Sequence, residues 1–289
     1  MQNKFINKLA EKPTRWPIWF VIFPFFSLVF SSLIVGIFAS LPGVGGFIGN
    51  LSPILQFFVS FGLVYIVFSI LSKKKPSASD LGFDTKALTK KNIILVIGVF
   101  IITHILFFLF AKIGGNPSNA AALFTDSGFG KGFFSDLILI IAGTICAPVF
   151  EELIYRGFML RSAHDGMLKF FPKSTSIFGI PAIFAIVVVA LAFILPHVSD
   201  FSINIMTISY FITSAGFSIV YLLTRSMVAA MVSHSLQSCF AFSQILILGH
   251  GDYPLSPVIY GISFLCPIIV YFIGRGMQKG FMKNESLKK

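Results

Sequence analysis

Residues 137–160 read LILIIAGTICAPVFEELIYRGFML, an apolar run interrupted by two adjacent glutamates, Glu151 and Glu152. A helix needs about 20 apolar residues to cross the hydrocarbon core of a bilayer, so this stretch predicts a transmembrane helix. Ionisable side chains inside a bilayer are costly, and they usually serve a function. The stretch therefore predicts a membrane protein whose active site includes this glutamate pair.

The composition of the whole chain agrees with a location in the membrane. Of its 289 residues, 56% are hydrophobic and 11% are charged, whereas soluble domains have roughly 25% charged residues. In lipid every backbone polar group must be paired within its own segment, so the long apolar runs predict helices. We expect an all-α, polytopic transmembrane bundle of about eight helices. The expected spans cover approximately residues 16–41, 47–71, 93–113, 133–160, 177–197, 201–224, 227–248 and 256–274.

The formal net charge of +11 follows the topology of these spans. With the N-terminus inside the cell, every Lys and Arg except Lys112 and Lys131 lies on the inner side. The positive-inside rule predicts this asymmetry. We therefore expect a multi-pass protein of the cell membrane with both termini cytoplasmic. The basic charge sets orientation in the lipid bilayer, and we assign no nucleic-acid partner.

The chain divides into three expected regions within one membrane domain. Residues 1–132 hold the first three spans and a cytoplasmic loop at 72–92, whose later part can form a short helix at the membrane interface. Residues 133–250 form a core that carries the unusual polar side chains. Residues 251–289 hold the last span and a basic tail, which we expect on the anionic inner leaflet.

Cysteine spacing and the N-terminus add two smaller expectations. Cys146, Cys239 and Cys266 all lie in apolar spans without metal-type spacing, and a free Cys there packs as a small hydrophobe. The first span is too long for the core of a signal peptide, so we expect it to be retained as an anchor.

Helical spacing separates the two glutamates. Arg156 follows Glu152 by four residues and lies on the same face of the helix, a spacing that suits an ion pair. Glu151 points about 100° away and has no cation one turn further on. We expect Glu152 to be neutralised by Arg156 and Glu151 to be free to face another group. The alternative is an interfacial salt-bridge cluster that only ends the helix.

Three histidines lie in other spans. Phe193 and His197 are spaced i, i+4 at the end of one span, and His234 and Ser238 have the same spacing in another. A lone His near a helix end is more often a capping or satisfied group than a catalyst, and His104 has no polar companion at helical spacing. Together with the glutamates, however, His197 and His234 supply the groups that acid–base chemistry needs.

Counting residues from the inner surface tests whether these groups lie at one depth. Glu151 lies about 15 Å of helix from Arg161, and His234 lies about 13–14 Å from Arg225. His197 fits less well, because a helix that starts at residue 177 would carry it about 30 Å up.

These residues resemble the motifs of the CAAX-protease and bacteriocin-processing family (CPBP, also called Abi) of intramembrane glutamate proteases. The family pattern EExxxR, FxxxH, HxxxN appears as Glu151-Glu152-Leu-Ile-Tyr-Arg156, Phe193-Ile-Leu-Pro-His197 and His234-Ser-Leu-Gln-Ser238. The resemblance covers roughly residues 133–250, and the first three spans match only as membrane helices.

The chain departs from the family pattern at two places. The interval from Glu151 to His197 looks longer than usual, and Ser238 replaces the final Asn. In the resembling enzymes that Asn is thought to help hold the oxyanion. A serine hydroxyl can donate one hydrogen bond, so Ser238 is an imperfect substitute. Losing one oxyanion donor can cost about 10²–10³ in rate.

The resemblance implies hydrolysis of peptide bonds in membrane-associated proteins or peptides. It implies that Glu151 is the general base and that His197 orients the attacking water. His234, with Ser238, would stabilise the oxyanion, while Glu152 and Arg156 hold the electrostatics of the site. No cofactor is implied, and the residues do not choose between prenylated CAAX termini and leader peptides as substrates.

Three other readings use the same residues. Glu151, His197 and His234 could bind zinc, although the chain has no HExxH helix. A proton-coupled transporter could use them as a proton relay. The third alternative is a non-catalytic membrane scaffold of the same fold, which the replacement by Ser238 suggests.

Overall fold

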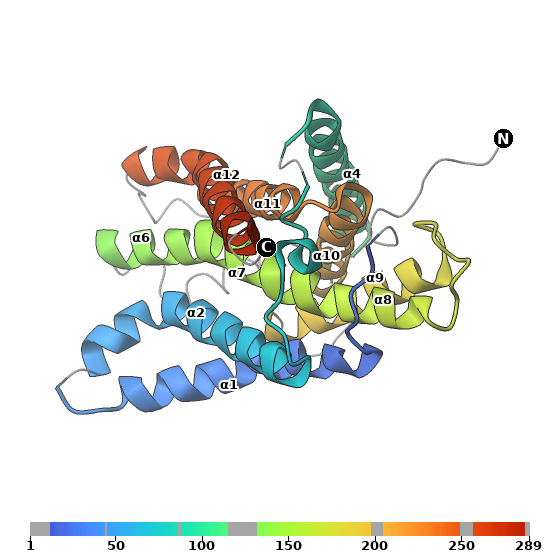
Figure 1. Ribbon diagram of the computed structural model, residues 1–289. Helices are drawn as coiled ribbons and strands as arrows, with labels where there is room; N and C mark the ends of the chain where they lie inside the picture. The colour runs from blue at the N-terminus through green and yellow to red at the C-terminus, as the bar shows by residue number, and fades with distance from the viewer. Residues whose placement is uncertain are drawn as a thin grey trace.

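The computed structural model describes residues 12–43, 45–85, 88–114, 132–197, 205–248 and 257–286, which form a bundle of helices without a β-strand (Figure 1). This confirms the expected all-α, polytopic membrane fold. Residues 115–131 connect the third and fourth expected spans, and residues 201–204 begin the sixth; both ranges lie outside the described residues. Five described stretches are long and apolar enough to cross a membrane: Ile18–Ala39, Ile48–Leu71, Phe133–Leu168, Ile180–His197 and Thr207–Thr224.

The remaining predicted spans are also helical. They correspond to α4 (Lys90–Gly114), α11 (Met227–Leu248) and α12 (Pro257–Ser286). The last of these extends well beyond the predicted end at residue 274. Helices α11 and α12 pack together, and α4 packs against α10 (Ile205–Thr224) and α11.

The first two spans form an antiparallel pair at one side of the bundle (Figure 1). They are α1 (Ile22–Ala39), which follows the 3-10 turn η2 (Ile18–Val21), and α2 (Gly45–Leu71). Many of their large side chains point outward, among them Phe30 and Ile37, which are 55% and 64% exposed. Such an apolar outer surface suits contact with lipid.

The helix that carries the glutamates is longer than predicted. It continues past residue 160 to Leu168 and spans 36 residues, about 54 Å, against a hydrocarbon core of about 30 Å. Its consecutive parts are α6 (Phe133–Ile141), the π-helix η3 (Ala142–Cys146), α7 (Ala147–Glu151), the π-helix η4 (Glu152–Leu160) and α8 (Arg161–Leu168). The predicted end at residue 160 was wrong. The apolar run gives way there to polar residues such as Arg161 and Asp165, but the helix continues through them and residues 161–166 are buried.

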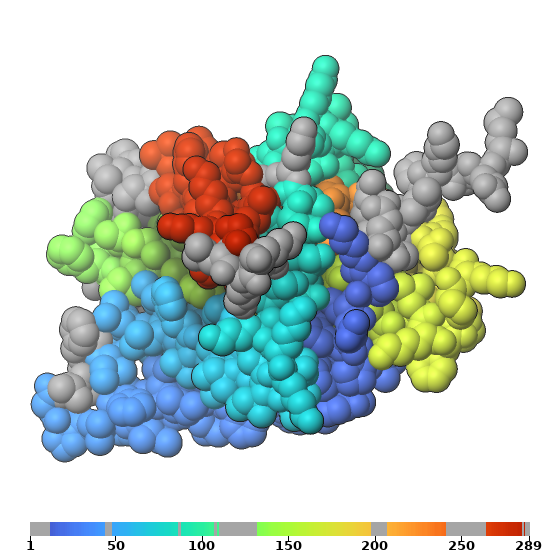
Figure 2. Space-filling model, viewed as in Figure 1, coloured from blue at the N-terminus to red at the C-terminus, as the bar shows by residue number. Residues whose placement is uncertain are grey.

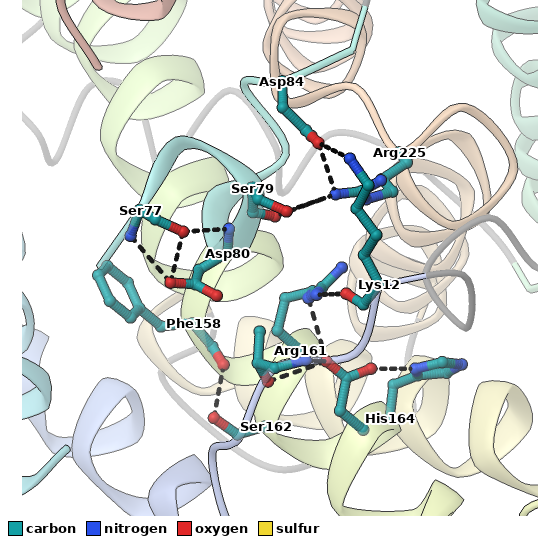
Figure 3. A network of polar contacts seen from close by, with 12 residues as sticks. Lys12, Ser77, Ser79, Asp80, Asp84, Phe158, Arg161, Ser162, His164 and Arg225 are labelled. Atoms are coloured by element: carbon teal, nitrogen blue, oxygen red, sulfur yellow. Dashed lines mark hydrogen bonds and ion pairs between the residues drawn. The ribbon is translucent and has the colours of Figure 1, made fainter. Parts of the chain in front are cut away.

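A polar network surrounds α8 (Figure 3). Asp165 accepts hydrogen bonds from the backbone and hydroxyl of Thr14, at 2.7 and 2.9 Å, and pairs with Arg161 at 3.2 Å. The Arg161 guanidinium also donates to the Lys12 carbonyl. The segment before α1 is therefore fastened to the end of the long helix.

The segment around Asp84 connects further parts of the chain at the same end of the bundle (Figure 3). Its carboxylate binds the ammonium of Lys12 at 2.8 Å and the guanidinium of Arg225 at 2.9 Å. Gln278 of α12 donates to the backbone carbonyls of Phe83 and Thr85. The segments predicted to lie inside the cell thus meet at one end of the molecule.

The loop at 72–92 contains a short helix, whose apolar side chains Ala78 and Leu81 are buried. It is α3 (Ala78–Leu81), which begins with a capping box between Ser77 and Asp80 and ends at Gly82. Gly82 has φ +79°, and a Cβ there would lie 2.8 Å from the Tyr221 side chain.

The α8–α9 connection, residues 169–179, protrudes at one edge of the molecule (yellow in Figure 2). Helix α9 (Ile180–Ile194) starts three residues after the predicted start at 177, with Pro181 in its first turn. It ends in the 3-10 turn η5 (Leu195–His197). Because α9 packs against both α8 and α10, it brings this turn beside the glutamate-bearing helix.

Candidate active site

The two glutamates occupy a distorted part of the long helix. Glu151 is the last residue of α7, and Glu152 is the first residue of η4. Wider π-helical stretches therefore flank the five residues of α7 on both sides. Such stretches are rare in proteins and occur frequently at functional sites.

Pro148 explains one contact of this distorted region with α11. Proline has no backbone N–H, so the carbonyl one turn earlier lacks its usual partner. That carbonyl belongs to Thr144, and it accepts a 2.7 Å hydrogen bond from the Ser235 hydroxyl of α11. Ser235 directly follows His234, so this bond fixes His234 relative to the long helix.

Glu152 is the centre of a buried charge network. Its Oε1 accepts from Arg156 Nη1 at 3.0 Å and from His234 Nδ1 at 2.9 Å. The side chains of Glu152 and Arg156 are fully buried. The ion pair predicted from the i, i+4 spacing is confirmed, and it does not end the helix. The bond to His234 was not predicted, because 82 residues separate the partners.

Arg156 extends this network to α10. Its Nη2 donates to the carbonyl and hydroxyl of Ser214 at 2.8 and 2.7 Å. Its guanidinium carbon lies 5.3 Å from the ring centres of both Phe193 and Phe217 and 5.9 Å from that of Tyr155. Arg156 thus holds α9 and α10 against the glutamate helix through hydrogen bonds and cation–π contacts.

Glu151 differs from its neighbour. It is 4% exposed, and its Oε2 is buried without a hydrogen-bond partner in the described part of the chain. Within the same residues, no hydrogen bond or ion pair joins it to His197 or His234. Buried polar atoms normally have partners, and Oε2 of Glu152 also lacks one. The two glutamates therefore differ in their bonds to neighbours: Glu152 binds two cationic or imidazole groups through Oε1, and Glu151 binds no described residue.

His197 lies beside the other histidine. Its Nδ1 is 2.6 Å from the Phe193 carbonyl, and its ring stacks on the Phe193 ring with centroids 4.5 Å apart. The Phe193 ring also meets the His234 ring edge-on at 5.9 Å. The count of helical rise from residue 177 therefore overstated the distance between the two histidines. Part of the error is that α9 begins three residues later, at Ile180.

The positions of Ser238 and His104 complete the predicted set. Ser238 follows His234 by one turn of α11 and is half-buried. His104 packs between the rings of Phe100 and Phe240, and its Nδ1 bonds the Phe100 carbonyl.

Sequence reasoning missed the contribution of α10. Tyr210, Ser214 and Phe217 recur at helical spacing and contact His197, Arg156 and His234, respectively. The spacing i, i+4, i+7 was a visible signal, but it carries no Asp, Glu, His, Lys or Arg that would attract notice.

The structure also bears on the zinc alternative. Within the described ranges, no group of three or more His, Cys, Asp and Glu side chains is arranged to hold a metal ion. Glu151, His197 and His234 therefore do not form a preassembled three-ligand set.

Comparison with known proteins supports the resemblance seen in the motifs. The family model for type II CAAX prenyl endopeptidase Rce1-like proteins matches residues 133–240. That range contains every residue of the candidate site, from Glu151 to Ser238. No curated protein and no solved structure matches the chain.

Proposed function

From the match of residues 133–240 to the Rce1-like CAAX prenyl endopeptidases, we infer that this protein is an intramembrane endopeptidase. We propose that it hydrolyses peptide bonds of membrane-associated proteins or peptides, using a water molecule activated by Glu151. The observation that carries this proposal is the contrast between the glutamates. Arg156 and His234 both donate to Oε1 of Glu152, whereas Glu151 makes no hydrogen bond to a described residue. The Oε2 atoms of both glutamates are buried without a partner in the described part of the chain.

The hydrogen bonds of the two imidazoles support distinct roles. A carbonyl and a carboxylate accept hydrogen bonds, so Nδ1 carries the proton in both His197 and His234. Neutral His197 then presents the lone pair of Nε2, which can accept a hydrogen bond from the attacking water. His234 next to the Glu152 carboxylate can carry a second proton, and its Nε2–H can donate to the oxyanion.

The reaction follows from these roles. Glu151 takes a proton from water while the water oxygen forms a bond to the peptide carbonyl carbon. His234 and the Ser238 hydroxyl stabilise the negative oxygen of the tetrahedral intermediate. Glu151 then passes the proton to the peptide nitrogen as the C–N bond breaks. A new carboxyl group and a free amine leave the site.

The replacement of Glu151 by Gln tests this mechanism, because Gln keeps the shape but cannot take the proton. Purified protein in liposomes would be given an internally quenched, farnesylated peptide ending in a CAAX sequence. We expect Glu151→Gln to lower kcat by about 10²–10⁴, the usual contribution of a general base. A fully active Glu151→Ala protein would end the proposal.

A membrane proteomics comparison of cells with wild type and with Glu151→Ala addresses the substrate. We expect uncut membrane-associated proteins to accumulate in the variant. If wild type cleaves neither the peptide nor any cellular protein, the scaffold alternative that Ser238 suggests is favoured.

We propose that water activation needs no metal. The metal-dependent alternative assigns zinc to Glu151, His197 and His234. We expect the purified, active protein to contain no stoichiometric zinc and to keep its activity in chelator. Activity that is lost in chelator and restored by zinc would establish the alternative.

We further propose that both termini face the cytoplasm. The polar network of Asp84 and Asp165 supports this orientation, because it gathers Lys12, Arg161 and Arg225 at one end of the bundle.

A further inference from the structure

Helix α10 supplies a face that runs along the candidate site without belonging to its three motifs. Tyr210, Ser214 and Phe217 lie at i, i+4 and i+7, and they contact His197, Arg156 and His234. These three partners come from η5, η4 and α11. One helix therefore contacts both candidate catalytic histidines and the arginine that pairs with Glu152.

The two imidazoles are held by the same arrangement. In each, Nδ1 is bound to an acceptor: the Phe193 carbonyl for His197 and the Glu152 carboxylate for His234. In each, an aromatic ring of α10 lies against the imidazole. The ring centres of His197 and Tyr210 are 4.7 Å apart. Those of His234 and Phe217 are 4.5 Å apart, at an interplanar angle of 22°.

We propose that Tyr210 and Phe217 are positioning residues, which hold the imidazoles so that each Nε2 is directed toward the reacting atoms. This inference rests on the proposed peptidase function. One hydrogen bond at Nδ1 still leaves an imidazole free to swing about that bond. An aromatic ring against its face removes this freedom. A misplacement of about 1 Å at a catalytic group can cost about 10²-fold in rate.

His197 depends most on this support. It stands at the end of a three-residue 3-10 turn, and Phe193 and Tyr210 both lie against its ring, at 4.5 and 4.7 Å. Because the contact of Tyr210 is made by its ring, Tyr210→Phe should preserve the support, whereas Tyr210→Leu should remove it. Phe211 is the adjacent aromatic residue of α10 and makes no ring contact among the described residues, so Phe211→Leu is a matched control.

Carbethoxylation by diethyl pyrocarbonate, followed by peptide mass spectrometry, reports on each imidazole without any substrate. We expect His197 to react at least threefold faster in Tyr210→Leu than in wild type, with His234 unchanged. We expect Phe217→Leu to accelerate His234 instead. Tyr210→Phe and Phe211→Leu should react like wild type. Unchanged rates at both histidines in both Leu variants would overturn the inference.

Cleavage of the farnesylated peptide gives the second readout. We expect Tyr210→Leu to lower kcat at least tenfold with little change in KM, and Tyr210→Phe to restore it. In the His197→Ala background, Tyr210→Leu should have no further effect. A wild-type rate for Glu151→Gln would refute the peptidase proposal itself. An inactive Glu151→Gln protein beside a fully active, normally labelled Tyr210→Leu protein would refute only the role of Tyr210.

Discussion

Glu151 and Glu152 are neighbours in the chain, but their surroundings give them opposite contributions to stability. Glu152 shares a buried ion pair with Arg156, whereas Glu151 makes no hydrogen bond among the described residues. Removing one partner of a buried ion pair leaves an uncompensated charge, and this costs about 3–5 kcal/mol. Removing a charge that has no partner carries no such cost.

We therefore predict that Arg156→Met lowers the free energy of unfolding by about 3–5 kcal/mol. Glu151→Gln should leave it unchanged or raise it. Thermal unfolding in detergent, followed by the loss of monodisperse protein, measures both variants side by side. Equal destabilisation by the two variants would contradict the assignment of Glu151 as the unpaired carboxylate.

A second prediction concerns Ser238. Its hydroxyl is shorter than an Asn side chain, and its proposed role is to donate to the oxyanion. We expect Ser238→Asn to raise kcat and Ser238→Ala to lower it, with KM nearly constant in both. One oxyanion donor contributes about 10²–10³ in rate, so the difference between the two variants should approach that range. Identical kcat values in the three proteins would exclude position 238 from the oxyanion site.

At this scale, the sequence predicted contacts within a helix but not between helices. The Glu152–Arg156 pair follows from helical periodicity, because residues i and i+4 share a face. The bond from His234 to the same carboxylate depends on how α11 packs on η4, and nothing local encodes that packing. The contacts of Tyr210 and Phe217 were missed for the same reason.

At the scale of elements, α3 depends on the backbone at Gly82. This glycine has φ +79°, and a Cβ would lie 2.8 Å from Tyr221 and 2.9 Å from the Arg225 carbonyl. Gly43 has a similar φ of +84°, but a Cβ added there would meet no atom within 4 Å. Replacing Gly43 by Ala therefore measures the cost of the backbone conformation alone. That cost is about 1–2 kcal/mol for an L-residue.

We predict that Gly82→Ala destabilises the protein more than Gly43→Ala, because it adds a collision with Tyr221 to the conformational strain. Midpoints of thermal unfolding for both variants provide the measurement. Equal shifts would mean that α3 can move away from α10 at little cost.

The hydrogen bond from Ser235 to the Thr144 carbonyl joins α11 to η3. A typical hydrogen bond contributes about 0.5–1.5 kcal/mol to stability, so Ser235→Ala should be only mildly destabilising. Because Ser235 is adjacent to His234, Ser235→Ala should also displace His234 slightly. We expect this displacement to lower kcat by about tenfold, in line with the cost of a small misplacement. Ser162 bonds only within its own helix, to the Phe158 carbonyl, so Ser162→Ala should leave kcat unchanged.

The helix ends show where patterns of polarity mislead. The expected span ended at residue 160, before Arg161, His164 and Asp165, yet all three are buried in the continuing helix. The Asp165 carboxylate pairs with Arg161 and His164 and accepts from Thr14, so the helix can continue. A polar stretch marks a helix end only where water, and no other part of the chain, satisfies it.

At the scale of the whole molecule, packing brings together segments that the charge distribution predicts on one side of the membrane. The basic loops alternate along the sequence with outer connections that are poor in Lys and Arg. In the structure, the N-terminal segment, the α3 region and the α10–α11 turn meet through Asp84. The positions of Lys and Arg predicted that these segments share a side, because the positive-inside rule depends on where cations lie and not on side-chain contacts. That this side is the cytoplasm stays a prediction.

Single cysteines can establish this orientation directly. The native Cys146, Cys239 and Cys266 are buried, so their background reaction should be low. Pro42, after α1, and Lys74, after α2, are both exposed and lie at opposite ends of α2. We predict that a membrane-impermeant maleimide labels Pro42→Cys in intact cells and labels Lys74→Cys only after permeabilisation. The reverse pattern would place the basic loops and the polar network outside the cell, against the positive-inside rule, and would contradict the proposed orientation.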